Sequence, residues 1–436
     1  MKKFHPTRTG AAAALSVALV AVMAGCAQAP QQDTGDGSAL TVWLDAPRLA
    51  AGQAYADAHP ELDIRIVTVD RSTVISKINL ANQAGKGWPD MVWPGDPATI
   101  GLLASDQIGY AADISGYVPA DTRSQFADNA LAGCEIDDGL YCLRNDLGQT
   151  VLWYDQKLMT EYEYDVPTTW DEYAALGERV ATEHPGTIIG TLAGKTGAGA
   201  FFASSECATR DLVSSTEVRI DTAADECTRV TDLLQPLVSN GTVSPLDFAD
   251  PAVAKLGAED KILMMPGPSF FGAFAFRDAY NVTEGRIAAA PMPTWDGQTT
   301  PVAGSAGGGI LVVSSHASEA TQLAATDMAL FMTTDIDLQK TLPTFPAFVP
   351  AAAEWCTVQA EGGYYASDPC DAMTVMAPLV SPTFGSVTYQ PEWETTYNAT
   401  VVKAAGSDGS LDDALSEWGK QLDSAATNQG YAVTSE

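Results

Sequence analysis

The chain has 436 residues, with 55 Asp and Glu against 23 Lys and Arg, for a formal net charge of −32. This length exceeds that of one ordinary domain, so we expect two or three. The acidic balance argues against nucleic acids and anionic membrane surfaces as partners, because both carry negative charge themselves.

The first 25 residues have the features of a secretion signal. Lys2, Lys3 and Arg8 make the leader positive, and residues 11–23 form an apolar run. That run is too short to span a bilayer as a stable helix, which takes about 20 residues. The segment Met23-Ala24-Gly25-Cys26 resembles the bacterial lipobox. The resemblance implies cleavage before Cys26 and a lipid on its sulfur, and an ordinary signal peptide with a chance cysteine is the alternative.

Residues 26–38 are polar, contain Pro and Gly and have no hydrophobic periodicity, so they are predicted to be a flexible tether. Beyond them, no segment of the sequence is both apolar and long enough to cross a membrane. We therefore expect an extracytoplasmic body that is anchored to the cell membrane only through lipid on Cys26.

Six further cysteines fall into three pairs that are close in sequence. An even number of cysteines in an exported chain indicates disulfides, and close pairs close the shortest loops. Zinc is the competing interpretation, but histidine is nearly absent and no C-x-x-C motif occurs. We predict no metal site and the bridges Cys134–Cys142, Cys207–Cys227 and Cys356–Cys370.

Strand and helix patterns alternate along the chain, which predicts an α/β fold with a mostly parallel sheet. Strands are expected at residues 39–44, 64–69 and 91–93, with Ser72 capping a helix between the last two. The pattern recurs later, with strands expected at residues 150–154, 262–265, 287–291 and 310–313. Helices are expected to begin at the capping box Thr169-x-x-Glu172, at Ser318 and at Ser410.

An ordered set of short phrases resembles family 1 extracellular solute-binding proteins, the class that includes maltose-binding proteins. They are residues 87–92 (GWPDMV), 149–158 (QTVLWYDQKL), 166–173 (VPTTWDEY), 261–267 (KILMMPG), 290–293 (APMP) and 307–310 (GGGI). The sequence departs from the family pattern at Asp155, where Asn is usual, and at Asp260, where Gly is usual. The resemblance covers residues 39 to about 345 and weakens beyond that.

The resemblance implies a two-lobed fold of the periplasmic-binding-protein type (type II), with a ligand cleft between lobes joined by hinge crossovers. Lobe one would hold residues 39–147 plus 304–345, and lobe two residues 148–303 plus 346–436. Gly148 and the run from Gly304 to Gly309 are candidate hinge positions, because glycine tolerates unusual backbone angles.

Ligand contacts are expected directly after strands, because open α/β sheets bind ligands at the carboxyl ends of their strands. A sugar needs flat aromatic surfaces for its apolar faces and carboxylates or amides for its hydroxyls. The family resemblance adds aromatic positions in lobe two. The predicted contacts are Trp43, Asp45, Trp93, Asp96, Asp146, Gln149, Phe270, Phe271, Tyr389 and Trp393. Trp170 and Trp418 are expected in the core, and Trp295 in a surface turn.

The resemblance implies a monomeric binding protein that passes a carbohydrate to the membrane permease of an ATP-driven (ABC) importer, with no cofactor and no catalysis. A non-sugar solute, namely a polyamine, an iron chelate or a peptide, is an alternative, since an acidic cleft suits a cation. An exported glycan hydrolase is a further alternative. The sequence contains no G-x-S-x-G, H-E-x-x-H or Walker A motif to favour an enzyme.

Overall fold

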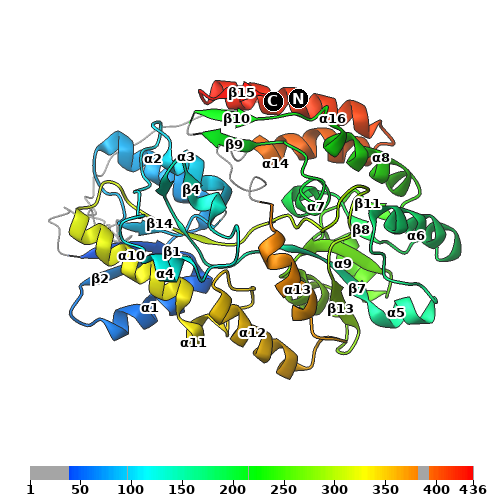
Figure 1. Cartoon of the computed structure of the whole chain (residues 1–436), viewed down its shortest axis with the longest axis horizontal. Coiled ribbons are helices and arrows are strands. Elements are labelled where there is room, and N and C mark those ends of the chain that lie inside the picture. Colours follow the sequence, from blue (N-terminus) through cyan, green and yellow to red (C-terminus); the bar gives the residue numbers. More distant parts are fainter. Residues whose placement is uncertain (1–38, 96, 215, 382–391, 436) are drawn as a thin grey trace, which may run out of the picture.

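The computed structural model describes residues 39–95, 97–214, 216–381 and 392–435. The predicted signal peptide (1–25), the lipid site Cys26 and the tether (26–38) lie outside the described residues, as do Asp96 and Tyr389. Figure 1 shows two groups of strands and helices side by side, joined near the middle of the molecule.

The first group is built on a five-stranded sheet in the order β2-β1-β3-β14-β6. β1 pairs in parallel with β2 and β3, whereas β14 runs antiparallel to β3 and β6. β14 lies more than 160 residues after β6 in the sequence, yet in the sheet it is placed between β3 and β6. The strands are β1 (Leu40–Leu44), β2 (Ile64–Thr68), β3 (Met91–Val92), β6 (Leu143–Arg144) and β14 (Ile310–Val313), with a small hairpin of β4 (Glu135–Ile136) and β5 (Gly139–Leu140) beside them.

The second group contains a three-stranded sheet, β12-β7-β13, with all pairs antiparallel. Two smaller sheets, β11-β8 and β15-β10-β9, complete it. The strands are β7 (Thr150–Asp155), β8 (Gly190–Thr191), β9 (Asp211–Ser214), β10 (Glu217–Arg219), β11 (Val243–Ser244), β12 (Met264–Pro268), β13 (Ile287–Ala290) and β15 (Ala432–Thr434). β12 starts two residues after the predicted Ile262, which instead makes a single bridge to Ile188.

Helices cover the sheets of both groups (Figure 1). Around the first lie η1 (Ala46–Arg48), α1 (Leu49–Ala58), η2 (Arg71–Thr73), α2 (Val74–Ala84), η3 (Pro97–Thr99), α3 (Ile100–Ala104), α4 (Ala120–Arg123), η4 (Ala132–Cys134), α10 (Glu319–Thr334) and α11 (Ile336–Gln339). With the second lie α5 (Gln156–Glu161), α6 (Trp170–Glu183), α7 (Gly194–Phe201), α8 (Asp225–Ser239), α9 (Pro251–Ala258), the π-helical η5 (Gly272–Ala279), α12 (Val349–Gly362), α13 (Cys370–Met376), η6 (Ala377–Leu379), α14 (Glu392–Tyr397), η7 (Asn398–Val402), α15 (Lys403–Ala405) and α16 (Leu411–Asn428).

The predicted caps are present at three helices and absent at one. Thr169 and Glu172 form the predicted capping box, and the hydroxyls of Ser318 and Ser410 cap α10 and α16. Ser72 does not cap α2. The carboxylate of Asp70 accepts the Ser72 backbone N–H instead and begins η2, because Asp70 still has extended backbone angles whereas Ser72 lies inside the turn.

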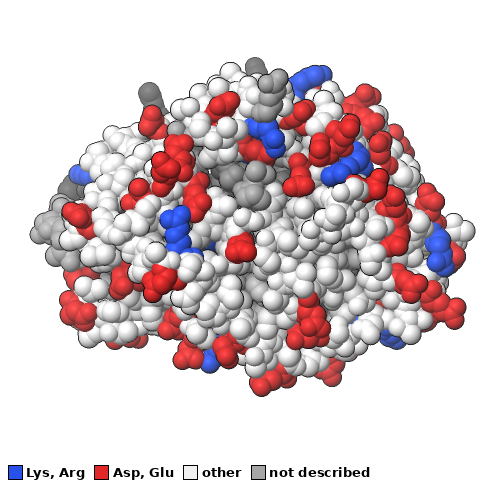
Figure 2. Space-filling view, in the orientation of Figure 1, with Lys and Arg blue, Asp and Glu red and all other residues white. Residues whose placement is uncertain are grey.

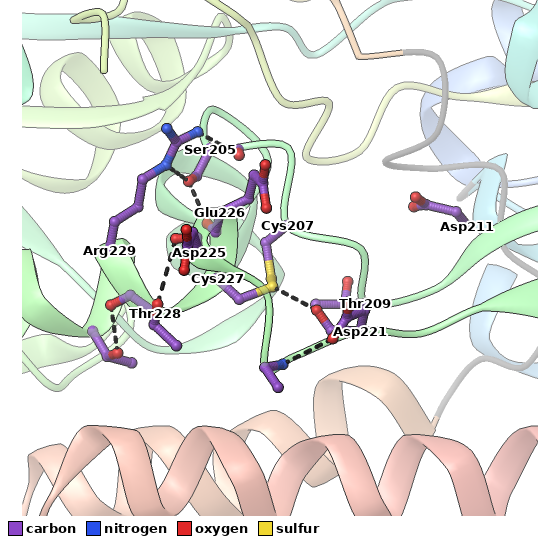
Figure 3. Close-up of a disulfide and its surroundings, with 12 residues drawn as sticks. Ser205, Cys207, Thr209, Asp211, Asp221, Asp225, Glu226, Cys227, Thr228 and Arg229 are labelled. Carbon is purple, nitrogen blue, oxygen red and sulfur yellow. Dashed lines mark hydrogen bonds between the residues drawn. A yellow bond between two sulfur atoms is a disulfide. The ribbon is translucent and has the colours of Figure 1, made fainter. Parts of the chain in front are cut away.

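All three predicted disulfides are present, Cys134–Cys142, Cys207–Cys227 and Cys356–Cys370. Figure 3 shows the Cys207–Cys227 bridge, which ties the start of α8 to the segment after α7. Beside it, the Arg229 guanidinium donates to the side-chain and backbone oxygens of Ser205 at 2.5 and 2.7 Å. The bridge and the arginine therefore hold the same loop from the same helix.

The core contains Trp170 and Trp418, as predicted, but also Trp295, which was expected at the surface. The Trp295 ring stacks on Trp170 with centroids 5.2 Å apart, and the Arg229 guanidinium lies 4.9 Å from the Trp295 ring centroid. A turn residue is buried here because a large aromatic ring recovers more free energy by packing than by staying in water.

Three backbone segments pass side by side between the two groups of strands. Residues 144–150 run in the middle, with Gln149 bridged to Ser305 on one side and Asp146 bridged to Pro346 on the other. Backbone hydrogen bonds from Thr150 to Gly304 and from Leu147 to Phe345 join the same segments. We call these three segments, namely residues 144–150, the segment around Ser305 and the segment around Pro346, the crossover. The lobe boundaries predicted from the sequence stay a proposal, and the crossover lies where those boundaries fall.

Candidate functional site

The carboxyl ends of the first group's parallel strands point toward the crossover. β14 enters its sheet directly from the crossover segment 304–309 and runs antiparallel to β3, so β3 ends where β14 begins. β1 is parallel to β3, and its end lies at the same edge. Asp45 and η1 follow β1, and Trp93 follows β3. These residues form what we call the first edge.

The second group presents an equivalent edge from the opposite side. β7 leaves the crossover at Thr150, which lies opposite Pro268 at the end of the antiparallel β12. Ser269 and Phe270 therefore face back toward the crossover. β8 and β11 run parallel to the chain leading into β12, so α7 and Asp247, which follow them, lie at this edge as well. We call it the second edge.

Glycines of the crossover bring the two edges together. A Cβ built on Gly309 would lie 1.8 Å from Cζ2 of Trp93, so the indole rests directly on the glycine backbone. A Cβ on Gly307 would lie 3.5 Å from Cε1 of Phe270. Trp93 and Phe270 thus contact the crossover two residues apart, one from each edge. No side chain fits at position 309 without moving the Trp93 ring.

The first edge holds a compact group made of Asp45, Arg48 and Trp93. The Arg48 guanidinium carbon lies 4.3 Å from the Trp93 ring centroid, and its Nη1 donates to Asp45 Oδ2 at 3.2 Å. The Trp93 side chain is 1 % exposed. Its Nε1–H and Asp45 Oδ1 are both buried and make no hydrogen bond to any described residue. Buried polar atoms without partners are uncommon in proteins, and each calls for an explanation.

The second edge also carries buried polar atoms that no described residue satisfies, namely Ser269 Oγ and Gln149 Oε1. The two residues are adjacent, since the Ser269 backbone N–H donates to the Gln149 carbonyl at 2.8 Å. Gln149 is predicted as a ligand contact, and its side-chain nitrogen already donates to the Met373 carbonyl at 3.2 Å. Its side-chain oxygen is therefore free to accept a hydrogen bond from a ligand.

The amino end of α7 faces the same edge, and acidic side chains surround it. Asn398 Oδ1 accepts the Gly194 N–H at 3.0 Å, and Glu394 Oε1 accepts the Lys195 N–H at 3.4 Å. Asp247 Oδ2 lies 2.7 Å from the position a Cβ on Gly194 would take. Burial raises the pKa of Asp247 above its ordinary value. The helix end is therefore already capped by protein groups, and Asp247 is the carboxylate beside it.

Asp146 belongs to the crossover and has its hydrogen-bonding needs met by the protein. Its Oδ1 accepts from the Gly309 backbone N–H at 2.8 Å and from Asn145 Nδ2 at 3.0 Å. Arg144 beside it donates to the carbonyls of Asp146 and Leu147 at 3.1 and 2.8 Å. The geometry gives Asp146 a structural task, tying two crossover segments together, and we leave it out of the site proposed below.

Three other predicted contacts pack against neighbouring side chains. Phe271 is buried against Phe248, with ring centroids 4.5 Å apart, and against Gly267. Trp393 is buried in an aromatic cluster with Trp418. Trp43 is half-buried on β1 and packs against the core. Of the described candidates, the two edges bring together Asp45, Trp93, Gln149 and Phe270.

Sequence reasoning missed Arg48 and Asp247 as members of the edges. Arg48 follows Asp45 by three residues in a Pro-started turn, and Asp247 follows the short strand β11. The signal for Arg48 was present, because a charged residue one turn after a strand-end carboxylate pairs with it readily. β11 has only two residues, too few to show a hydrophobic pattern in the sequence.

The visible face of the protein is acidic. Figure 2 shows Asp and Glu spread over both halves of the visible face, with few Lys and Arg among them. This agrees with the net charge of −32. Within the parts of the chain that the structure describes, no helix is long and apolar enough to cross a membrane.

The chain belongs to the bacterial extracellular solute-binding protein family, whose model matches residues 50–357. Its fold is the two-lobed α/β arrangement of type II periplasmic binding proteins. The family and the two facing edges define the class of protein: a binding protein for a solute outside the cytoplasm.

Particular relatives carry names that specify sugars. The chain is similar to the galactooligosaccharide-binding protein of Bacillus subtilis (strain 168), 27 % identical over 153 residues, which is 34 % of each protein. The match thus spans about a third of that relative. Its fold matches the galacto-N-biose-/lacto-N-biose I-binding protein of an ABC transporter from Bifidobacterium longum, solved with lacto-N-biose (TM-score 0.75, 18 % identity, 92 % of this chain and 100 % of that one). An ABC transporter associated binding protein from B. animalis subsp. lactis, solved with beta-1,6-galactobiose, gives a TM-score of 0.70 at 16 % identity, covering 91 % and 99 %.

Proposed function

We propose that this protein captures a sugar or oligosaccharide outside the cell and delivers it to the membrane permease of an ATP-driven importer. The observation that carries the proposal is the meeting of Trp93 and Phe270, from opposite edges, on the glycines of one crossover segment. Buried polar atoms of Asp45, Trp93, Gln149 and Ser269 lie along those edges without partners among the described residues.

The chemistry of the two edges suits a sugar. A pyranose has apolar C–H faces, which pack against aromatic rings, and a rim of hydroxyls, each of which both donates and accepts. The edges offer aromatic rings together with carboxylate, amide and hydroxyl groups. The sugars named for the relatives make galactose-containing oligosaccharides the first ligands to test.

Binding works by clamping. A ligand enters when the two lobes separate about the crossover. Gly148, Gly307 and Gly308 have positive φ values of 59°, 103° and 81°, backbone angles that glycine adopts without strain. A sugar that touches both edges favours the closed form by the contacts that exist only when it is closed. The permease then recognises the closed form.

The rest of the proposal concerns location and assembly. The protein is held at the outer face of the cell membrane by lipid on Cys26, with residues 26–38 as a tether. It acts as a monomer and binds its sugar without altering it, since the family and the relatives that it resembles are binding proteins.

Isothermal titration calorimetry on the body of the protein, residues 27–436 without the lipid site, tests the proposal. The panel contains lacto-N-biose, beta-1,6-galactobiose, maltose, monosaccharides, spermidine, a ferric siderophore and a short peptide. We expect binding of at least one carbohydrate and recovery of that carbohydrate chemically unchanged. Binding only of spermidine, the siderophore or the peptide, or turnover of the sugar, refutes the proposal.

A further inference from the structure

Helix α12 lies at the border between the two groups of strands, with α11 on one side of it and α13 on the other (Figure 1). It leads into the second group but is attached to the first. It packs on α11, and the Val349 backbone N–H at its start donates to the Gln125 carbonyl at 2.9 Å. Further along, Trp355 Nε1 donates to the Leu342 carbonyl at 2.8 Å, and the Trp355 ring lies 5.5 Å from that of Phe345. These contacts make α12 move with the first group.

The chain that follows α12 is attached to the second group. The Ala366 backbone N–H donates to the carbonyl of Ile287, the first residue of β13, at 2.8 Å. The Tyr365 ring stacks on Trp153 of β7, with centroids 5.8 Å apart. α13 comes next and packs on both of these strands. Helices α12 and α13 are therefore neighbours in the chain that belong to opposite sides of the hinge.

The backbone passes from α12 to the second group through Gly362 and Gly363. Both glycines are exposed, and a Cβ built on either one would have no atom within 4 Å. Gly363 has a positive φ of 67°. Glycine gives the backbone its widest choice of angles, and nothing packs around these two residues. This connection by itself would act as a pivot and leave α12 able to rotate relative to the second group.

The Cys356–Cys370 disulfide adds a second covalent connection between the same two helices. Cys356 lies on α12 six residues before Gly362, which is about 9 Å along the axis at the rise of an α-helix. Cys370 is the first residue of α13. One attachment fixes only the end of a helix, whereas two separate attachments also fix its direction. The bridge thus removes the rotation that the two glycines would allow.

We infer that the Cys356–Cys370 disulfide is a covalent restraint across the hinge, which joins a helix attached to the first lobe to a helix packed on the second and so limits how far the lobes separate. This inference deepens the proposed function and rests on its clamping mechanism. Cys370 lies beyond residues 50–357, which the family model matches, so the bridge is not part of the matched family pattern.

The restraint has a consequence for affinity. Without the bridge, the protein without ligand samples wider lobe separations, and arrangements close to the closed form make up a smaller fraction of the ensemble. The apparent affinity falls in proportion to that fraction, because only those arrangements hold the ligand from both sides. A covalent link that narrows the ensemble beforehand reduces the ordering that binding must impose. The bridge therefore preorganises the protein for its ligand.

Small-angle X-ray scattering and calorimetry with beta-1,6-galactobiose test the restraint on the body of the protein, residues 27–436. Without ligand, the double variant Cys356→Ser/Cys370→Ser should have a larger radius of gyration than wild type. Its affinity for galactobiose should be about three- to tenfold weaker. Saturating galactobiose should return the radius of gyration to the wild-type value, because the closed form does not depend on the bridge.

The other two disulfides provide matched controls. Cys134–Cys142 lies within the first group and Cys207–Cys227 within the second. Replacing either pair by serine should lower the melting temperature, as the loss of any disulfide does, but leave the radius of gyration and the affinity at wild-type values. Circular dichroism at the temperature of measurement verifies that all three double variants are folded.

A further variant covers the case in which the Cys356→Ser/Cys370→Ser protein does not fold. Trp355→Phe keeps the bridge but removes the hydrogen bond that attaches α12 to the Leu342 carbonyl. It loosens the same restraint at its other end, so it should shift the radius of gyration and the affinity in the same direction by a smaller amount.

The outcomes separate this inference from the proposed function. A folded Cys356→Ser/Cys370→Ser variant with the wild-type radius of gyration, or an equal increase in the two control variants, overturns the restraint. Tighter binding by the variant also overturns it, because the bridge would then oppose closure. Wild-type protein that binds no carbohydrate overturns the proposed function, while the scattering comparison, which needs no ligand, still decides the restraint.

Discussion

Arg144 and Asp146 of the crossover lie beside the first edge, yet the two regions use their polar groups in opposite ways. In the crossover, Arg144 donates to Ser305 Oγ at 2.5 Å and to the Gly307 carbonyl at 3.0 Å, and the carboxylate of Asp146 accepts two hydrogen bonds. At the edges, atoms of Asp45 and Trp93 are just as buried but lack partners among the described residues.

The difference separates support from function. Polar groups satisfied within the protein stabilise it, and their loss costs stability. Polar groups buried without partners cost stability in the free protein, and a ligand that supplies the partners recovers that cost as affinity. Substitutions in the crossover should therefore act on folding, and substitutions at the edges on binding.

Of these substitutions, Arg144→Met should have the largest effect, a loss of folding stability. It removes hydrogen bonds from a buried guanidinium to three carbonyl groups, of Asp146, Leu147 and Gly307, and hydrogen bonds to charged groups are worth about 1.5–3 kcal/mol each. We expect the free energy of unfolding in urea to fall by about 3 kcal/mol or more. The control is Arg123→Met, in an exposed ion pair worth about 1 kcal/mol or less. Equal losses in the two variants would contradict the structural role of Arg144.

Gly309→Ala should affect both folding stability and sugar binding, because this residue joins the crossover to the first edge. The new Cβ would lie 1.8 Å from the Trp93 ring, so the ring must move. We expect a loss of about 1–3 kcal/mol in unfolding free energy, typical of overpacking, together with weaker sugar binding. Gly116→Ala, at an exposed turn with no atom within 4 Å of the new Cβ, is the matched control and should change neither.

Trp93→Phe should act mainly on binding. Phenylalanine keeps an aromatic ring at this position but lacks the Nε1 donor, and one hydrogen bond is worth about 1 kcal/mol, or roughly fivefold in affinity. Calorimetry should show this loss while the melting temperature shifts by only a few degrees. A sharp fall in melting temperature with unchanged affinity would show that Trp93 serves the core alone.

Asp247→Asn should have the smallest effect, which is on the free energy of unfolding, and the sign of this effect depends on pH. Burial raises the pKa of Asp247 above its ordinary 3.8, so the folded state holds the proton more tightly than the unfolded state. The protonated form therefore contributes stability that is lost as the pH rises through the folded pKa. The free energy of unfolding in urea of the asparagine variant, relative to that of wild type, should rise from pH 3 to pH 7. A constant or reversed difference would contradict the burial of this carboxylate.

Local patterns in the sequence predicted much of the fold. The cysteine spacing predicted all three disulfides, because short loops close most easily. Hydrophobic runs located β7, β13 and β14, and the capping box located α6. Each of these features is decided by residues that are near one another in the chain.

The site depends on contacts that local patterns do not encode. Trp93 and Trp393 look alike in sequence as aromatic residues beside element ends, and both are buried, yet Trp93 rests on Gly309 whereas Trp393 packs beside Trp418. Asp45 was found as a strand end, but its pairing with Arg48 over an indole depends on where β3 ends. Such choices follow from tertiary packing alone.

A crystal structure of the protein with its tightest-binding sugar tests the central claim most directly. The account predicts one sugar chain between the two edges, with hydroxyls on Asp45 Oδ1 and Trp93 Nε1 from one lobe and contacts to Ser269 and Phe270 from the other. Arg144 and Asp146 should keep their crossover hydrogen bonds unchanged. A sugar that contacts a single edge, or that binds through Asp146 after breaking the crossover, would contradict the account.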